Sequence, residues 1–241
     1  AGTNQPFLHD SWILLIWIFG FICVYIVVAI FTKDSVSDFS EIEPALSKFI
    51  NERQRMQQEL KIARDVQMSF LPAHIPIIPG LDIASRCIPA LNVGGDYYDF
   101  VKIAPKKIGV VIGDVSGKGT RAAFYMTLVK GFLKALSRTV YSPAELLKEL
   151  NLLFFENAKR DAFISMAYGV FDTENNSLVM ARSGHNPVIL YQNNTKEIRV
   201  IKTEGLALGL EKGMLFNKMM QYEKIEINCF DIILFYTYGL T

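Results

Sequence analysis

Cysteine is scarce in this chain of 241 residues, where Cys23, Cys87 and Cys229 are widely spaced and form no CxxC pair. So few scattered thiols exclude a disulfide framework and a cysteine zinc site, and they indicate a globular part that folds in a reducing compartment. An excess of charge is also lacking, because 25 Lys and Arg residues balance 24 Asp and Glu residues. The sequence therefore predicts no nucleic-acid partner.

Charge is missing altogether from residues 12–31, which are 20 consecutive residues without Asp, Glu, Lys or Arg. As a helix this segment is long enough to cross about 30 Å of hydrocarbon. A buried core helix is the alternative, but the segment is apolar on every face and includes Trp12 and Trp17, which favours a transmembrane helix. We expect residues 1–11 to be an extracytoplasmic or loop remnant.

Basic residues predict the orientation of this span. No Lys or Arg precedes it, whereas Lys33 and Lys48 follow it closely. Positive charge favours the cytoplasmic side, so we expect an inner-membrane protein whose C-terminal part lies in the cytoplasm. Because the chain begins with Ala1 and not with Met, we also expect a fragment of a longer protein with a sensor part upstream.

Residues 32–70 are expected to form a helical, coiled-coil-like linker. The stretch 43–70 is rich in Glu, Arg, Gln and Lys and has no Gly, and Pro44 suits the first turn of a helix. Two interpretations are open: a parallel two-stranded connector between two copies of the chain, or an amphipathic helix that packs on its own domain. The positions that carry this pattern, in steps of four and three, are Phe49, Arg53, Met56, Leu60, Ala63, Gln67 and Phe70.

The remaining residues, 71–241, alternate short strand-like runs with turns, interrupted by two helical stretches. The first stretch is 120–138, and the second begins at Ser142-Pro143 with an N-cap and a first-turn proline. Consecutive strands with short polar turns are antiparallel, so we predict an α+β domain in which helices cover one of two stacked sheets. The later strands are expected at 162–171, 178–183, 188–191, 197–201, 219–227 and 232–237.

Two acidic motifs, GGDYYDF around Asp96 and GDVSGKG around Asp114, flank a predicted hairpin. If Ile103 faces Ile108 across its turn, the paired residue numbers sum to 211, and Asp96 falls within one residue of Asp114. Two carboxylates that close repel each other unless they are protonated or bridged by a cation, and such oxygen ligands select Mg²⁺ or Mn²⁺.

A solvated acidic pair without function is the alternative interpretation of this hairpin. The neighbouring sequence favours the metal site, because Gly94-Gly95 lets the backbone approach a ligand and Ser116-Gly117-Lys118-Gly119 allows a tight turn from strand to helix. Residues 113–120 do not fit a nucleotide-binding P-loop, since only three residues separate the first Gly from Gly117-Lys118. His185 is expected to pack or hydrogen-bond within a local turn.

These motifs resemble those of the SpoIIE and RsbU family of bacterial serine phosphatases, which are relatives of the metal-dependent PP2C phosphatases. The resemblance implies an antiparallel β-sandwich flanked by helices. It also implies hydrolysis of phosphoserine or phosphothreonine on a protein, typically an anti-sigma-factor antagonist, at a centre of two Mn²⁺ or Mg²⁺ ions. It rests on ARDVQMSFLP (63–72), NVGGDYYDF (92–100), IGDVSGKGTRAA (112–123), SGHNP (183–187), GLALGL (205–210) and LFYTYGLT (234–241).

Carried over by position, the resemblance makes Asp96 and Asp114 catalytic metal ligands and gives the backbone carbonyl of Val115 a coordinating place. The residues expected as a phosphate or substrate loop are Gly95, Ser116, Gly117, Lys118 and Gly119, although Lys118 also reads as a solvated loop lysine.

One departure from the family pattern is Tyr238, which stands where the family has the Asp of YTDG. The chain also stops at Thr241, before the segment in which the family places its last metal-binding Asp, so we expect a domain that is incomplete at its C-terminus. Either Tyr238 impairs an enzyme, or the protein is an inactive phosphatase-fold module that binds a signalling partner.

Overall fold

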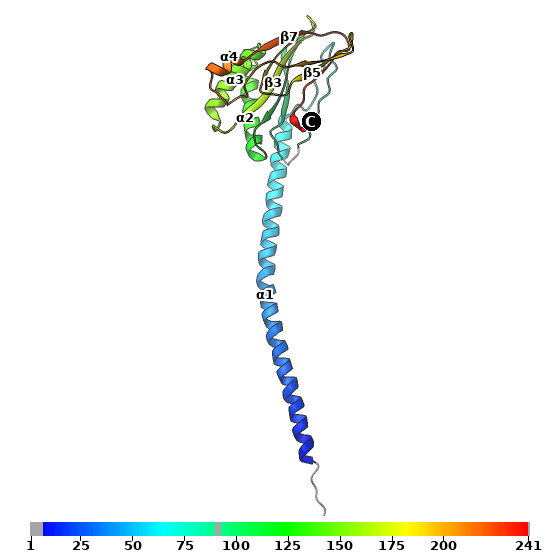
Figure 1. Ribbon diagram of the computed structural model, residues 1–241, viewed down its shortest axis with the longest axis vertical. Coiled ribbons are helices and arrows are strands. Elements are labelled where there is room, and N and C mark those ends of the chain that lie inside the picture. The colour runs from blue at the N-terminus through cyan, green and yellow to red at the C-terminus, as the bar shows by residue number, and fades with distance from the viewer. Residues whose placement is uncertain (1–6, 90–92, 241) are drawn as a thin grey trace, which may run out of the picture. The chain divides into compact units, whose positions relative to one another are not determined.

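The computed structural model describes residues 7–89 and 93–240, without the side chains of residues 7–11, 13 and 33–42. The chain divides into two compact units, residues 1–59 and 60–241. Figure 1 labels the main elements. The prediction for the N-terminal remnant lies partly outside the described residues, since residues 1–6 are not among them.

Helix α1 (Phe7–Phe70) runs through the predicted span and linker without interruption. Its segment Leu14–Thr32 has a mean hydropathy of 2.9 and no buried residue, so it is long and apolar enough to cross a membrane. The expected helix start at Pro44 is wrong, because this proline lies inside α1. A proline there removes one backbone hydrogen bond, and the hydrogen bonds on either side keep the helix continuous.

The globular unit contains two antiparallel sheets (Figure 1). The larger has the strand order β1-β2-β3-β4-β7, and the smaller has the order β6-β5-β8. The class is therefore α+β, as predicted. The strands are β1 (Tyr97–Ala104), β2 (Lys107–Val115), β3 (Ile164–Asp172), β4 (Ser177–Ser183), β5 (Val188–Gln192), β6 (Glu197–Ile201), β7 (Tyr222–Glu226) and β8 (Ile232–Leu234).

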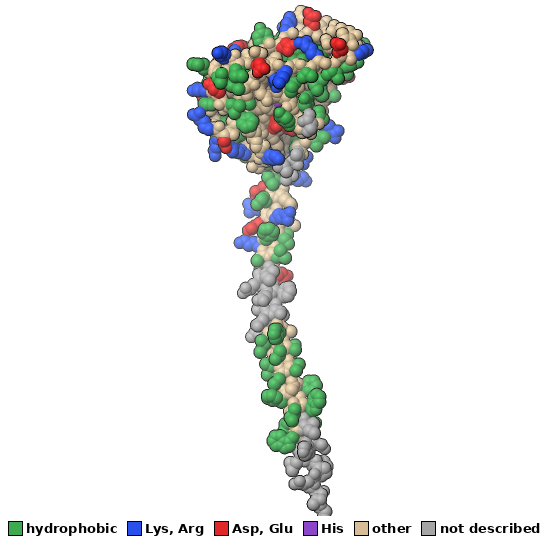
Figure 2. Space-filling view, in the orientation of Figure 1, with side chains coloured by type: hydrophobic (Ala, Val, Ile, Leu, Met, Phe, Trp, Pro, Cys, Tyr) green, Lys and Arg blue, Asp and Glu red, His purple; other side chains and the backbone are tan. Residues whose placement is uncertain are grey.

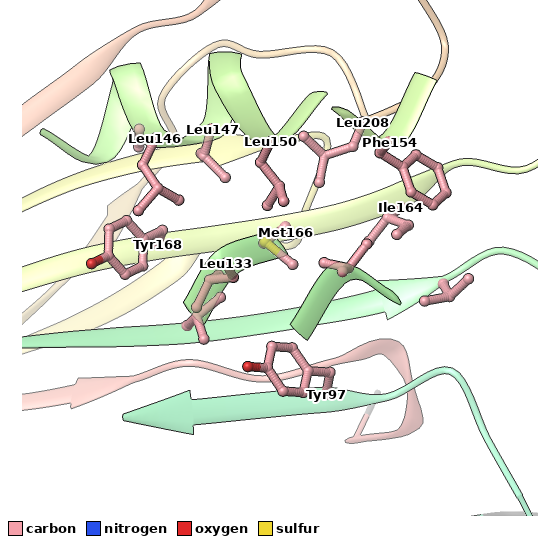
Figure 3. Close-up of a cluster of buried hydrophobic side chains, with 14 of the residues drawn as sticks. Tyr97, Leu133, Leu146, Leu147, Leu150, Phe154, Ile164, Met166, Tyr168 and Leu208 are labelled. Carbon is pink, nitrogen blue, oxygen red and sulfur yellow. The ribbon is translucent and has the colours of Figure 1, made fainter. Parts of the chain in front are cut away.

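Hydrophobic cores cover both faces of the larger sheet. On one face, helices α2 (Thr120–Leu136) and α3 (Pro143–Asn157) pack against it, and Figure 3 shows Leu147 and Phe154 of α3 above Met166 and Tyr168 of β3. On the other face, β3 and β4 pack with the smaller sheet in a second cluster. Because successive residues of a strand point to opposite faces, β3 is buried along its whole length.

The β1–β2 hairpin has a bulge that the sequence did not reveal. From Tyr97↔Gly113 to Lys102↔Ile108 the paired residue numbers sum to 210, and the register shifts before Ala104↔Lys107. Ile103 is therefore the extra residue on β1, and the predicted sum of 211 is wrong along most of the hairpin. Continued by one residue, the register sets position 96 opposite position 114.

The C-terminal third differs from the predicted order in two places. Helix α4 (Met214–Met219) was not expected, and the strand predicted from residue 219 begins only at Tyr222. Glu211 stabilises the start of α4 by accepting hydrogen bonds from the backbone N–H groups of Gly213 and Phe216. The last predicted strand ends early at Leu234, and a 3₁₀ turn (Tyr238–Leu240) follows.

Candidate metal site

The open end of the β1–β2 hairpin brings the two predicted carboxylates together. The N–H of Val115 donates to the carbonyl of Gly95 at 3.3 Å, which joins the chain just before Asp96 to the end of β2. Gly95 has no room for a side chain, because a Cβ there would lie 2.6 Å from the carbonyl oxygen of Val115 and 3.1 Å from Oδ1 of Asp114. This close approach needs glycine.

Electrostatics distinguishes this pair of carboxylates from ordinary surface acids. Burial, and next to it the negative charge of Asp96, raise the pKa of Asp114 to about 6. Burial also raises the pKa of Asp96, while a hydrogen bond with the side chain of Thr237 acts in the opposite direction. Among the described residues, no Lys, Arg or His forms an ion pair with either carboxylate. Within the described part of the chain, neither carboxylate therefore has a cationic partner.

The donors at this end of the sheet fit a hard divalent cation. Asp96, Asp114 and the carbonyl of Val115 offer oxygen atoms, which Mg²⁺ and Mn²⁺ prefer. A cation would offset the negative charge of Asp96, which adds to burial in raising the pKa of Asp114. The described residues contain no group of three or more His, Cys, Asp or Glu side chains able to hold a metal ion. The described donors could therefore form only part of a metal centre.

The loop from β2 to α2 has the tight glycine geometry that was predicted, but its serine hydrogen-bonds to the start of β3. Gly117 and Gly119 have φ angles of 94° and 71°, which glycine adopts without strain. The hydroxyl of Ser116 accepts a hydrogen bond from the N–H of Phe163 at 2.9 Å, and its own N–H donates to the carbonyl of Phe163 at 2.9 Å. Ser116 thus fastens the loop to the start of β3, while Lys118 is exposed.

The family model for stage II sporulation protein E (SpoIIE) matches residues 104–241, more than half of the chain. The chain belongs to the SpoIIE family. The phosphoserine phosphatase RsbU of Bacillus subtilis (strain 168) is 30% identical over 189 residues, which cover 78% of this chain and 55% of RsbU. The chain thus spans about half the length of this relative. Asp96 precedes the segment that matches the family model.

Solved structures confirm the PP2C-like fold of this SpoIIE-family domain. The SiaA-PP2C domain of Pseudomonas aeruginosa has a TM-score of 0.59 at 15% identity, and the match covers 73% of this chain and 69% of that one. The RsbU and RsbW domains of Rv1364c from Mycobacterium tuberculosis have a TM-score of 0.53 at 25% identity, with 63% and 40% covered.

Sequence reasoning missed several residues that surround the site in this SpoIIE-family domain. The side chain of Gln67 donates to the carbonyl of Gly94 at 2.6 Å and accepts from its N–H at 3.1 Å. The last turns of α1 thereby hold the backbone two residues before Asp96. The sequence held one weak signal for this contact. Gln67 lies in the otherwise mostly apolar seam of the predicted linker helix, and a buried polar residue in such a seam needs a hydrogen-bond partner.

A buried polar pair supports the backbone of Asp114 from β3. Ser165 pairs with Asp114 in the β2–β3 register, and its hydroxyl lies 2.9 Å from Nδ1 of His185. Burial is the main cause that lowers the pKa of His185 to about 4. The ring of His185 is buried, but its hydrogen-bond partner Ser165 lies on β3 and not in the local turn that was predicted.

The second aspartate of GGDYYDF has a structural role. Asp99 is buried and accepts hydrogen bonds from the hydroxyl of Tyr97 at 2.9 Å and from Nζ of Lys130 at 3.3 Å. Lys130 also donates to the carbonyl of Phe70 at the end of α1. The same ammonium group therefore bridges β1, α2 and the last turn of α1.

Tyr238, the substituted position, is linked to the predicted site through the preceding residue. Its neighbour Thr237 hydrogen-bonds with Asp96, which brings the YTYG motif to the open end of the hairpin. The side chain of Tyr238 is 67% exposed and interacts electrostatically with the buried Arg182. Asp231 cannot replace the missing carboxylate, because its two oxygens accept hydrogen bonds from the N–H groups of Asn193 and Asn228.

Proposed function

We propose that this chain is the phosphatase part of a membrane-bound bacterial signalling protein and hydrolyses phosphoserine or phosphothreonine on a protein with the help of Mn²⁺ or Mg²⁺. One observation carries the proposal: a SpoIIE-family domain holds two carboxylates with raised pKa values at the open end of one hairpin, and no ion pair within the described residues engages them. The phosphoprotein substrate that we infer is of the anti-sigma-factor antagonist type, from the likeness to RsbU.

The side chains of Asp96 and Asp114 and the carbonyl of Val115 would hold the metal, and further ligands would complete a centre of two ions. Bound divalent ions would supply an activated water and neutralise the phosphate. The chain's own contribution is to fix these donors. Gly95 permits their close approach. Ser165 donates a hydrogen bond to the carbonyl of Asp114, and Ser116 accepts one from the N–H of Phe163, so the backbone is held at Asp114 and two residues after it. Partial burial of Asp96 and Asp114 strengthens charge interactions there.

Tyr238 is expected to impair the activity, because a phenol replaces a carboxylate beside Thr237. The Tyr238→Asp variant should therefore bind Mn²⁺ more tightly and release more phosphate from a phosphoserine peptide than the parent chain. Tyr141→Asp is the matched control, since Tyr141 is 58% exposed in the connection between α2 and α3. A Tyr238→Asp variant with unchanged metal affinity and no phosphate release would contradict the proposal.

The second candidate function is a module that binds a phosphoprotein without hydrolysing it. It is favoured by Tyr238 and by the lack of a third carboxylate among the described residues near Asp96 and Asp114. Binding of a phosphoserine peptide by both the parent chain and Tyr238→Asp, with phosphate release by neither in saturating Mn²⁺, would support this candidate.

We also propose that the chain is anchored in the inner membrane by residues 12–31, with the phosphatase domain in the cytoplasm, and that α1 forms a homodimer. Phe49 and Met56 of the predicted seam are both 62% exposed. In a cysteine-free background in membranes, Met56→Cys should crosslink to a second copy, whereas Gln58→Cys on the opposite side of the helix should not. Equal crosslinking of the two would contradict the dimer.

A further inference from the structure

Two segments far apart in the sequence run side by side past the candidate metal site. They are the loop and first turns of α2 (116–125) and the connection from α3 to β3 (158–163). Besides the Ser116–Phe163 hydrogen bonds, Arg121 forms an ion pair with Asp161, and the N–H of Lys159 donates to the hydroxyl of Tyr125 at 3.1 Å. These contacts fix the two segments against each other directly after the candidate ligand Asp114.

The surface of these segments is basic, although the chain as a whole has a net charge of only +1. We call Lys118, Arg121, Lys159 and Arg160 the basic rim. Asp161 is the only acidic residue in the two segments, and it is paired with Arg121. Lys118, Lys159 and Arg160 are exposed, and no ion pair engages them within the described part of the chain. The guanidinium of Arg160 lies 4.8 Å from the ring centre of Phe155, which orients it.

An exposed aromatic side chain belongs to the segment that carries Lys159 and Arg160 and is joined to the loop after Asp114. Ser165 pairs with Asp114, and the same register continued beyond Ile164 sets Phe163 opposite Ser116. Residues 163 and 165 therefore share one face of the sheet with Asp114 and Ser116. Its neighbours Ala162 and Ile164 are buried, whereas Phe163 is 42% exposed. An aromatic ring in this place offers apolar contact to a molecule whose phosphate enters at Asp96 and Asp114.

We propose that the basic rim and Phe163 form the docking surface for an acidic face of the phosphoprotein substrate, next to its phosphoserine. This inference rests on the proposed function. Charge complementarity selects the partner: three exposed cations that no ion pair engages within the described residues would attract a phosphorylated protein surface rich in Asp and Glu. A metal ion held by Asp96 and Asp114 would recognise the phosphate alone, and the basic rim would add recognition of the protein that carries it.

The test uses the full chain in phosphatidylcholine nanodiscs and two fluorescent phosphoserine peptides of equal length, one with acidic and one with basic flanks. Binding is measured by fluorescence anisotropy, and phosphate release is measured in parallel in Mn²⁺. The variants are K159E/R160E and Phe163→Ala. Their matched controls are K202E/K224E, which reverses two exposed lysines outside both segments, and Phe230→Ala, which removes an exposed ring elsewhere. Thermal unfolding confirms that each variant is folded.

The parent chain should bind the acidic peptide more tightly than the basic one. K159E/R160E should weaken binding of the acidic peptide about tenfold and reduce its salt dependence. Phe163→Ala should weaken binding of both peptides severalfold, and the two controls should bind like the parent. Equal binding by the parent, K159E/R160E and K202E/K224E would overturn the docking surface, and so would an absence of binding to the acidic peptide.

A lipid surface is the competing occupant. If phosphatidylserine in the nanodiscs, without peptide, protects residues 158–163 from amide hydrogen exchange, the rim faces the membrane and the proposal is wrong. The proposed function fails separately: selective peptide binding that K159E/R160E abolishes, without phosphate release by any form, would keep the docking surface and contradict the phosphatase.

Discussion

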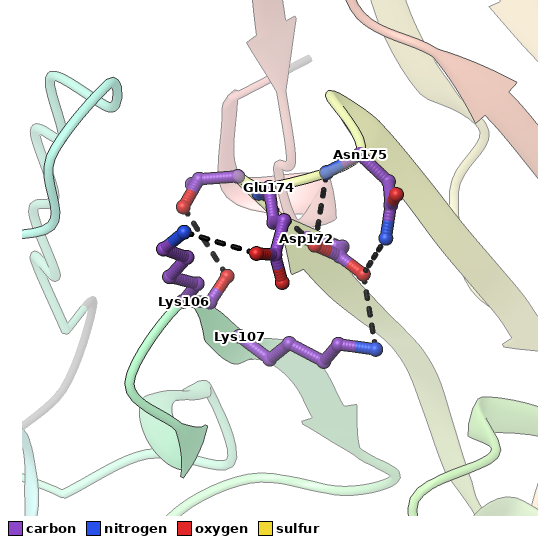
Figure 4. A network of polar contacts seen from close by, with 6 residues as sticks. Lys106, Lys107, Asp172, Glu174 and Asn175 are labelled. Atoms are coloured by element: carbon purple, nitrogen blue, oxygen red, sulfur yellow. Dashed lines mark hydrogen bonds and ion pairs between the residues drawn. The ribbon is translucent and has the colours of Figure 1, made fainter.

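Carboxylate pKa values are shifted in opposite directions at the two ends of the β1–β2 hairpin. At the closed end, Asp172 of β3 accepts from Nζ of Lys107 at 3.0 Å and from the side chain and backbone of Asn175 at 2.8 and 3.1 Å (Figure 4). These donors, with the Asn175 side chain first, hold the pKa of Asp172 well below its usual range. At the open end, the pKa values of Asp96 and Asp114 are raised instead.

The two ends of the hairpin differ in which groups stabilise their carboxylates. Donors and a lysine satisfy the closed end, and its ion pairs join the β1–β2 turn to the β3–β4 turn. The open end keeps two acids together, and no described Lys, Arg or His forms an ion pair with them, which costs stability in the metal-free protein. Such an arrangement is expected where a bound cation completes the site.

The largest expected effect is a stabilisation by metal that depends on the open end alone. Mn²⁺ at about 100 times its dissociation constant should stabilise the chain by about 2.7 kcal/mol. Asp114→Asn should abolish this stabilisation, whereas Asp172→Asn should keep it. Thermal unfolding of the full chain in detergent, with and without Mn²⁺, measures both. Loss of the metal effect in Asp172→Asn alone would reverse our assignment of the two ends.

A methyl group at Gly95 should be the next most harmful change. Gly95→Ala places its Cβ 2.6 Å from the carbonyl oxygen of Val115, so the hairpin end must shift, at a cost of about 1–3 kcal/mol. Gly94→Ala is the control, because its Cβ meets nothing closer than 4.0 Å. The free energy of unfolding and the Mn²⁺ affinity should both fall in Gly95→Ala only. Similar values for the two variants would show that the close approach is unimportant.

The open end should also make the metal-free protein less stable as the pH rises. The pKa of Asp114 is about 6 in the folded protein and about 3.8 in the unfolded chain, so the folded state binds more protons between these values. Stability should be highest below about pH 4 for this group and fall through about pH 6. Because the carboxylate is half-exposed, we expect the free energy of unfolding to fall by only about 1 kcal/mol.

Asp114→Asn removes this titration, so its unfolding temperature without metal should exceed that of the parent at pH 7 and approach it at pH 4. Melting curves in a chelating buffer at both pH values provide the measurement. A parent chain whose stability rises through this pH window more than that of Asp114→Asn would contradict the raised pKa.

The closed end should show the opposite pH dependence with the smallest effect. The pKa of Asp172 is lowered by folding, so its contribution to stability is present above the unfolded pKa of about 3.8 and is lost as the pH falls from there toward the folded pKa. Asp172→Asn should therefore lower the unfolding temperature slightly at neutral pH, with a smaller difference at acid pH. Glu174→Gln, at the more exposed neighbouring ion pair, should change less than Asp172→Asn.

Local patterns in the sequence predicted much of this arrangement. The α+β class and most strands followed from period-two runs and polar turns, and the pairing of Asp96 with Asp114 followed from the length of the hairpin. The bulge at Ile103 had no sequence signal, because it depends on how β1 twists against β2. Helix α4 was missed because six residues are too few to show a helical period.

Contacts across long sequence separations account for the rest. Gln67 weakened the predicted seam of α1 because its amide serves Gly94, 27 residues away. Ser116 was assigned to a phosphate loop by its neighbours, whereas its hydroxyl is engaged by Phe163 of a different segment. Thr237 was unremarkable in the sequence because only the folding of the second sheet brings it to Asp96.

The central claim is that Asp96 and Asp114 form a divalent metal site. Titration of the full chain with Mn²⁺ near pH 7, with free Mn²⁺ counted by electron paramagnetic resonance, measures the affinity directly. The account predicts saturable binding that Asp96→Asn and Asp114→Asn each weaken by more than about tenfold, while Asp172→Asn leaves it unchanged. Equal Mn²⁺ affinity in the parent and in both open-end variants would contradict it.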